Sequence, residues 1–197
     1  MLYVCQLDHA DIPYPTHTDT PDNEYGKNST MRSSGCGLCS SVMMADRLLI
    51  NPNFGLKDAL ELSFATGANH GSGTDYKLYA PALAERLGLD LEVTSDIDKL
   101  AECLKTGGCA IAHVRPHADG EKPYFSHNGG HYVTVISVES DGCFDVLDPS
   151  NRPGKFDDPY RSEMVKMKDG IAVCKPEALV KDVEMLEGRG FYLFKRK

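Results

Sequence analysis

The spacing of apolar residues changes near the middle of the chain, at Gly107-Gly108. Before this point apolar residues recur at helical spacing, and after it short β-rich runs are separated by turn residues. The pattern predicts helices over residues 37–49, 56–66, 76–88 and 95–106, and strands over residues 109–114, 131–138, 143–148, 170–175 and 190–196. Helices followed by strands favour the α+β class, with helices packed on a mainly antiparallel sheet.

A chain of 197 residues fits one domain, and we expect a single domain over residues 1–197. Residues 1–34 are rich in Pro, Asp, Asn, Thr and Ser and show little periodicity. They predict a long ordered loop with a short strand at residues 2–5. Loops of this length are usually functional.

Charge and hydropathy make several classes of partner improbable. The chain has 21 basic and 29 acidic side chains, a formal net charge of −8, and no block of like charges. This balance argues against nucleic acid and anionic membranes as partners. No apolar run approaches the ~20 residues that a membrane-spanning helix needs.

Seven cysteines, an odd number without regular spacing, favour reduced thiols over a disulfide framework. The start, "MLYVCQLDHAD", lacks the basic and apolar regions of a secretory signal. We therefore expect a reduced, cytoplasmic protein.

The segment "SSGCGLCSSVMMADRLL" places Cys36 between two glycines at the start of a predicted helix. Three readings compete: a redox pair with Cys39, a zinc site, or a lone nucleophile whose thiolate the helix N-terminus favours. Redox pairs of this spacing follow a strand in a βαβ unit, whereas a polar loop precedes this one. The histidine pairs 113/117 and 127/131 lie in turn-rich sequence, where a spacing of four does not form a zinc site. The nucleophile reading is therefore favoured.

A second stretch, "GGHYVTVISVESDGCFDVLDPS", reads as a β-hairpin with Asp141-Gly142 in its turn. If Val138 faces Cys143, His131 lies opposite Ser150 and Asp148 is its diagonal neighbour on the same face. Cys36, His131 and Asp148 then supply the nucleophile, the base and the orienting acid of a catalytic triad.

The motifs "SGCGLCSSVMM", "GGHYVTVISV" and "VLDPS", in this order, resemble the papain-like cysteine peptidases related to the double-glycine leader peptidases of bacteriocin exporters and their stand-alone relatives. The resemblance covers about residues 12–150. It implies a bacterial thiol hydrolase of papain-like fold, with Cys36 as nucleophile, His131 as base and Asp148 completing the triad. It implies no metal or organic cofactor.

The chain departs from this family in two respects. We expect no fused transporter. The family places an oxyanion-binding glutamine before the nucleophile, commonly in a Tyr-x-x-Gln-x-Asp setting followed by Tyr-Gly. In "PYPTHTDTPDNEYG" the glutamine position is occupied by His17, which we therefore expect to be the oxyanion donor, with the more distant Gln6 as the alternative.

The sequence thus predicts a cysteine hydrolase that cleaves a peptide or isopeptide amide in a peptide or protein substrate. Two alternatives remain open: a catalytically silent papain-like domain that binds a peptide or protein, and an acyltransferase or deamidase that uses the same triad.

Overall fold

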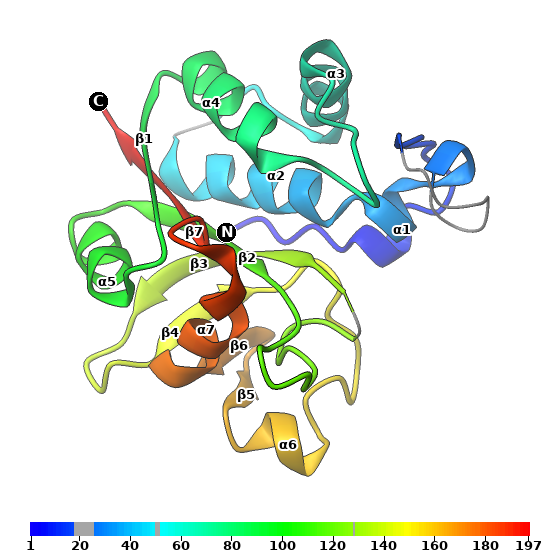
Figure 1. Cartoon of the computed structure of the whole chain (residues 1–197). Helices are drawn as coiled ribbons and strands as arrows, with labels where there is room; N and C mark the ends of the chain where they lie inside the picture. Colours follow the sequence, from blue (N-terminus) through cyan, green and yellow to red (C-terminus); the bar gives the residue numbers. More distant parts are fainter. Residues whose placement is uncertain (18–25, 50–51, 128) are drawn as a thin grey trace.

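The structure, a computed structural model, describes residues 1–17, 26–49, 52–127 and 129–197. Helices dominate the first half of the chain and strands the second half (Figure 1). The helical elements are η1 (Gln6–Asp8), η2 (Gly26–Asn28), α1 (Met31–Ser34), α2 (Cys36–Leu48), α3 (Leu56–Thr66), α4 (Tyr76–Leu87), α5 (Ile97–Lys105), α6 (Pro159–Ser162), α7 (Pro176–Val183) and η3 (Glu184–Leu186). The strands are β1 (Leu89–Thr94), β2 (Cys109–Val114), β3 (His131–Val138), β4 (Phe144–Leu147), β5 (Val165–Lys168), β6 (Ile171–Cys174) and β7 (Phe191–Arg196).

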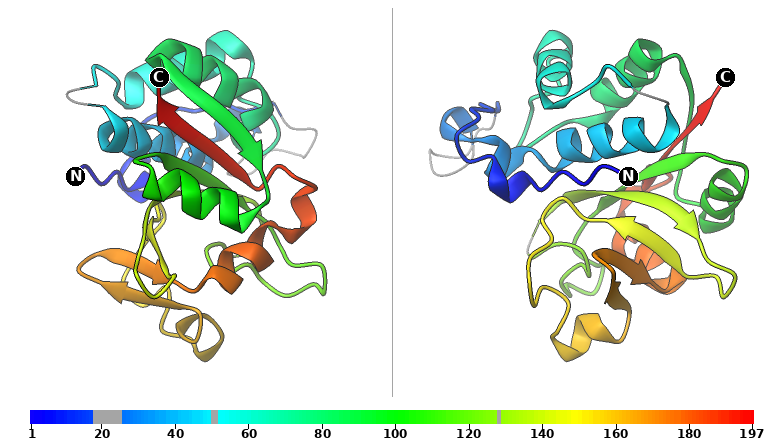
Figure 2. Two further views of the ribbon diagram at one scale, coloured as in Figure 1. Left: turned by 90° about the vertical axis from the view of Figure 1, so that its left-hand side faces the viewer. Right: turned by 180° about the vertical axis from the view of Figure 1, so that it is seen from behind.

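All seven of these strands join one antiparallel sheet in the order β1-β7-β2-β3-β4-β6-β5. Helices α2, α3 and α4 lie together on one side, whereas α5 and α7 lie on the other (Figures 1 and 2). The predicted combination of helices with an antiparallel sheet is confirmed. In the described ranges, no helix is long and apolar enough to cross a bilayer.

The two faces of the sheet bury different cores because side chains alternate along each strand. On β3, Tyr132 and Ile136 pack in the cluster that includes α2 and α4. Val133 and Val135 pack in the cluster that includes α5 and α7. The central strands are therefore covered on both faces, which holds the start of β3 firmly between two layers.

Local signals explain where several helices begin and end. The Asp75 side chain accepts a hydrogen bond from Lys77 N at 2.9 Å and so caps α4. Gly88 ends α4 in the left-handed conformation, with φ of 65°. Helix α5 begins two residues later than predicted, because the Asp96 side chain caps it by accepting hydrogen bonds from the amides of Asp98 and Lys99.

Several elements differ from the sequence prediction. Residues 2–5 form no strand, and the N-terminal segment instead contains η1, α1 and η2. Strands β1 and β5 and helices α6 and α7 were not expected. Strand β1 follows Gly88 directly and pairs with the C-terminal strand β7, a long-range contact that local sequence does not encode.

The hairpin of β3 and β4 has the predicted register at the end that carries His131. Thr134 lies opposite Leu147 and Val135 opposite Val146, which extends to the predicted pairing of His131 with Ser150. Near the turn the prediction was wrong by one residue, because Val138 lies opposite Phe144. A register shift of one residue between Val135 and Ser137 accounts for this difference.

The close approach of β7 to α7 yields a stability prediction. A Cβ atom built on Gly190 would lie 2.4 Å from Val183 Cβ, so this contact tolerates no side chain. We expect Gly190→Ala to reduce the free energy of unfolding by about 1–3 kcal/mol in urea denaturation. The control is Gly129→Ala, because a Cβ at Gly129 would have no neighbour within 4 Å. Equal stability of the two variants would contradict this packing.

Candidate active site

Cys36 is the first residue of α2 and is half-buried. The flanking glycines are required by close packing. A Cβ on Gly35 would lie 2.4 Å from the Met31 carbonyl oxygen, and one on Gly37 would lie 2.8 Å from the Tyr76 ring. The Gly-Cys-Gly motif therefore lets the helix start lie tightly against its neighbours.

Reciprocal hydrogen bonds attach α2 to β3 directly beside Cys36 and His131. Ser40 Oγ donates to the Tyr132 carbonyl at 3.1 Å, and Thr134 Oγ1 donates to the Ser40 carbonyl at 3.1 Å. All three residues are buried. This link holds the N-terminal end of the helix against the first residues of the strand.

A stack of aromatic rings reinforces the same junction. Tyr76 stacks on Tyr132 with ring centroids 4.2 Å apart, and its hydroxyl donates to the Gly37 carbonyl at 2.5 Å. His113 stacks on Tyr132 at 4.3 Å. Helices α2 and α4 and strands β2 and β3 are thus fixed around Cys36.

His131, the first residue of β3, is held by Asp148, which follows β4. His131 Nε2 lies 2.8 Å from Asp148 Oδ1, and both side chains are buried. Ser150 donates its backbone amide to the same carboxylate oxygen at 2.9 Å, and its Oγ lies 3.1 Å from His131 Nε2. Because Nε2 contacts Asp148 and Ser150, Nδ1 is the ring nitrogen that remains available for a hydrogen bond with the Cys36 thiol.

The electrostatics match a thiolate and imidazolium pair. Burial opposes ionisation of Cys36, but the hydrogen bond and charge of His131, together with the backbone amides of Tyr132 and Gly37, lower its pKa overall. Burial also opposes protonation of His131, but hydrogen bonds with Asp148 and Cys36 raise its pKa to about 9. The two shifts widen the pH range in which both groups are charged.

Lys155 is a member of this cluster that the sequence analysis missed. Its ammonium makes a close ion pair with Asp148 Oδ2 and also donates to Ser150 Oγ at 2.7 Å. Burial alone would raise the pKa of Asp148, but Lys155 and then His131 hold it well below its usual range. No motif signals Lys155, because it lies in an irregular segment between β4 and α6.

The other thiols differ from Cys36. Burial raises the pKa of five of them: Cys39, Cys103, Cys109, Cys143 and Cys174. Cys36 and Cys39 are both free, and the Cys39 side chain is fully buried in the core around α2. This arrangement gives no support to a redox pair.

The histidines considered for zinc have other contacts. His117 Nε2 lies 2.7 Å from Asp182 Oδ1, and its Nδ1 lies 3.0 Å from the Tyr160 hydroxyl. His113 is stacked on Tyr132, and burial lowers its pKa to about 3. Within the described part of the chain, no group of three or more His, Cys, Asp or Glu side chains is arranged to hold a metal ion.

The structure gives no support to the expected role of His17 as oxyanion donor. Its side chain is exposed, and its backbone pairs with His70. The residues that set its predicted register, Asp19 and Tyr25, lie outside the described residues. The upstream buried amide is that of Gln6, whose Nε2 donates to the Arg32 carbonyl in α1 at 2.7 Å.

A sequence signal for Gln6 was available. Tyr3, Gln6 and Asp8 fit the Tyr-x-x-Gln-x-Asp spacing with a glutamine in place, whereas Tyr14, His17 and Asp19 fit it only with a histidine. Only the later match leads into a Tyr-Gly, and this feature favours His17. Gln6 Oε1 is also buried without a hydrogen-bond partner.

Two surface hollows, of about 310 and 370 Å³, lie apart from this cluster. One lies between β1, β7 and α5, and the other between α5 and α7; neither is lined by Cys36, His131, Asp148 or Lys155. Their linings carry no nucleophile paired with a base.

Comparison with known proteins supports the fold assignment. The chain is similar to a crystal structure described as that of a "putative C39-like peptidase" from Bacillus anthracis, with 12% sequence identity and a TM-score of 0.51. The likeness covers 93% of this chain and 95% of that one. No family profile and no curated protein matches the sequence. The chain thus shares the fold of this structure over nearly its whole length.

The electrostatics predict that Cys36 is the most reactive of the seven thiols. We expect iodoacetamide at pH 6, read by mass spectrometry, to modify Cys36 first, because an unperturbed thiol is then only about 0.3% ionised. His131→Ala should slow this labelling by roughly two orders of magnitude, since the charge that lowers the Cys36 pKa is lost. Earlier modification of Cys5 or Cys39 would contradict the assignment.

Proposed function

We propose that this protein is a papain-like cysteine hydrolase that cleaves a peptide or isopeptide amide bond, with all 197 residues forming one catalytic domain. The observation that carries the proposal is Cys36 at the start of α2, its pKa lowered by a histidine that a buried carboxylate holds. The shared fold with a structure described as C39-like peptidase supports the same reaction class. A thiol and imidazole arranged in this way form a nucleophile with its own acid and base.

The acylation step follows from the two charged groups. The Cys36 thiolate attacks the substrate carbonyl carbon, forming a C–S bond while the carbonyl oxygen takes the negative charge. The His131 imidazolium then gives its proton to the amine nitrogen as the C–N bond breaks. Asp148 keeps the imidazole oriented and compensates its charge.

The deacylation step reverses the role of His131. The neutral imidazole accepts a proton from water, whose oxygen attacks the thioester carbonyl carbon. Collapse of the intermediate breaks the C–S bond, releases the carboxylic acid product and restores the thiolate and imidazolium pair. The proposed cycle uses no metal or organic cofactor.

For the oxyanion we propose two donors, the Cys36 backbone amide and the Gln6 side-chain amide. An N–H group at a helix N-terminus has no partner within the helix and is therefore available to an anion. Gln6 packs beside α1, which ends at Ser34 just before Cys36. Its NH₂ group has two donors, of which the Arg32 carbonyl uses one.

The proposed activity is tested by incubating the protein with a mixture of unlabelled peptides and identifying new termini by mass spectrometry. We expect cleavage by the wild type, no cleavage by Cys36→Ala, and a loss of up to about 10⁴-fold in turnover for Asp148→Asn. Cys143→Ser, which removes a half-buried thiol elsewhere, serves as the control and should retain full activity.

Other results would favour the alternatives. Ammonia release without new termini would indicate a deamidase, and a mass gain on an added amine an acyltransferase. Peptide binding that persists without any Cys36-dependent product would indicate a silent binding domain. Full activity of a folded Asp148→Asn variant would remove Asp148 from the triad.

The choice of oxyanion donor gives a separate prediction. Gln6→Ala should lower turnover by about 10²–10³-fold, the usual cost of removing one such donor, while the exposed His17→Ala should change it little. Cys36 labelling by iodoacetamide forms no oxyanion, so its rate should be the same in both variants if each folds. The reverse ranking of the two variants would restore His17 as the donor.

A further inference from the structure

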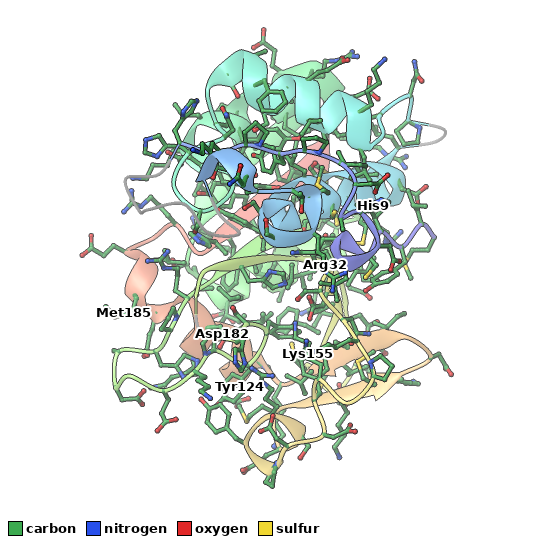
Figure 3. All side chains as sticks on the ribbon, turned by 90° about the vertical axis from the view of Figure 1, so that its right-hand side faces the viewer. His9, Arg32, Tyr124, Lys155, Asp182 and Met185 are labelled. Carbon is green, nitrogen blue, oxygen red and sulfur yellow. The ribbon has the colours of Figure 1, made fainter. Side chains whose placement is uncertain are left out.

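The side chain of Lys155 is 7% exposed, which is unusual for a lysine. It enters the molecule from the segment that joins β4 to α6, where Gly154 adopts a positive φ of 77°. In Figure 3 Lys155 appears below Arg32 and close to Tyr124, whose neighbour Phe125 accepts a hydrogen bond from Lys155 through its carbonyl. Such a buried cation requires partners, because its desolvation is otherwise too costly.

All three donors of the ammonium have acceptors. They are the Asp148 carboxylate, Ser150 Oγ and the Phe125 carbonyl, the last at 2.8 Å. With every N–H bonded and no lone pair left, Lys155 is neither a nucleophile nor a base in this structure. Its place beside the triad requires a different role.

The two carboxylate oxygens of Asp148 are divided between two cations. Oδ1 faces His131 Nε2 at 2.8 Å and Oδ2 faces the Lys155 ammonium. Ser150 Oγ touches all three groups, lying 3.0 Å from Asp148 Oδ1, 3.1 Å from His131 Nε2 and 2.7 Å from Lys155 Nζ. The carboxylate cannot rotate without breaking bonds on both sides.

We propose that Lys155 is a positioning residue of the reaction: it holds one oxygen of Asp148, fixes the other on His131, and moderates the negative charge that the imidazole experiences. This inference rests on the proposed function, since it assigns Lys155 a role through His131 and Cys36. Lys155 touches neither of these reacting groups in the described contacts.

Removal of the Lys155 charge should shift the pKa values of His131 and Cys36 in the same direction. Without it the imidazolium faces the undivided Asp148 charge and loses a nearby repulsion, so the pKa of His131 rises. The thiolate loses a favourable charge, so the pKa of Cys36 rises as well. Other charged or titratable groups face this network: Arg152 and Arg161 near Lys155, His113 near His131, and Tyr3, whose hydroxyl donates to the Asp148 carbonyl.

The test is the pH dependence of Cys36 alkylation, which requires no substrate. In the wild type we expect the rate to rise in two steps, one for formation of the thiolate and imidazolium pair and one for loss of the imidazolium proton. Lys155→Met should move both steps to higher pH, by on the order of one pH unit. Lys99→Met, which removes an exposed lysine paired with Glu92, is the matched control and should leave both steps unchanged.

A second variant separates charge from packing. Lys155→Gln keeps hydrogen-bond donors but removes the charge, so it should show the same upward shift. Labelling that is slower at every pH, with both steps unmoved, would overturn the inference and leave Lys155 a structural residue. An unshifted Lys155→Gln profile would overturn it too.

One measurement needs no variant. Nitrogen-15 NMR of the wild type should show the Lys155 ammonium as a slowly exchanging NH₃⁺ group at neutral pH, and a neutral amine there would overturn the inference.

If the wild type is alkylated first at another cysteine, the proposed function fails. If Cys36 is alkylated first but the Lys155→Met and wild-type profiles coincide, only the role of Lys155 fails.

Discussion

The buried carboxylate of Asp148 is the constraint around which the site is built. It is 2% exposed, and an ionised carboxylate removed from water is stable only if it is paired and hydrogen-bonded. Three separate contacts meet this need: the His131 ring at the start of β3, the Lys155 ammonium from the following loop, and the Ser150 amide. Satisfying this one group therefore fixes the end of the hairpin, the loop after β4 and the orientation of the imidazole.

A fixed imidazole is useful only if the thiol is fixed with it, although the two residues belong to different layers. The bonds that Ser40 exchanges with Tyr132 and Thr134 join those layers one helical turn from Cys36. These contacts are buried side-chain to backbone bonds, which are geometrically strict and costly to break. The helix thus takes its position from the same strand that presents His131.

The sequence predicted the parts of the site that regular structure carries. Cys36 follows from a helix start, and His131 and Asp148 follow from counting along a hairpin, because alternation in strands has a fixed period. The sequence did not predict Lys155, because an irregular loop has no regular spacing from which its neighbours can be inferred. For the proposed oxyanion donor the sequence does not decide between Gln6 and His17, because two segments fit one spacing and local sequence does not reveal which is buried. Strand β1 was also not predicted, because its pairing partner β7 lies at the other end of the chain and local sequence does not show this contact.

In the proposed mechanism the site is a row of alternating charges: the Cys36 thiolate, the His131 imidazolium, the Asp148 carboxylate and the Lys155 ammonium. The four charges sum to zero, so the fold buries them without a net charge, while the low dielectric strengthens each neighbouring attraction. A triad without Lys155 would carry one net negative charge, and attack would then move the thiolate charge onto the substrate oxygen within an anionic site. With Lys155 the site has no net charge, so the two proposed N–H donors need to stabilise only the thiolate charge that attack moves onto the substrate oxygen.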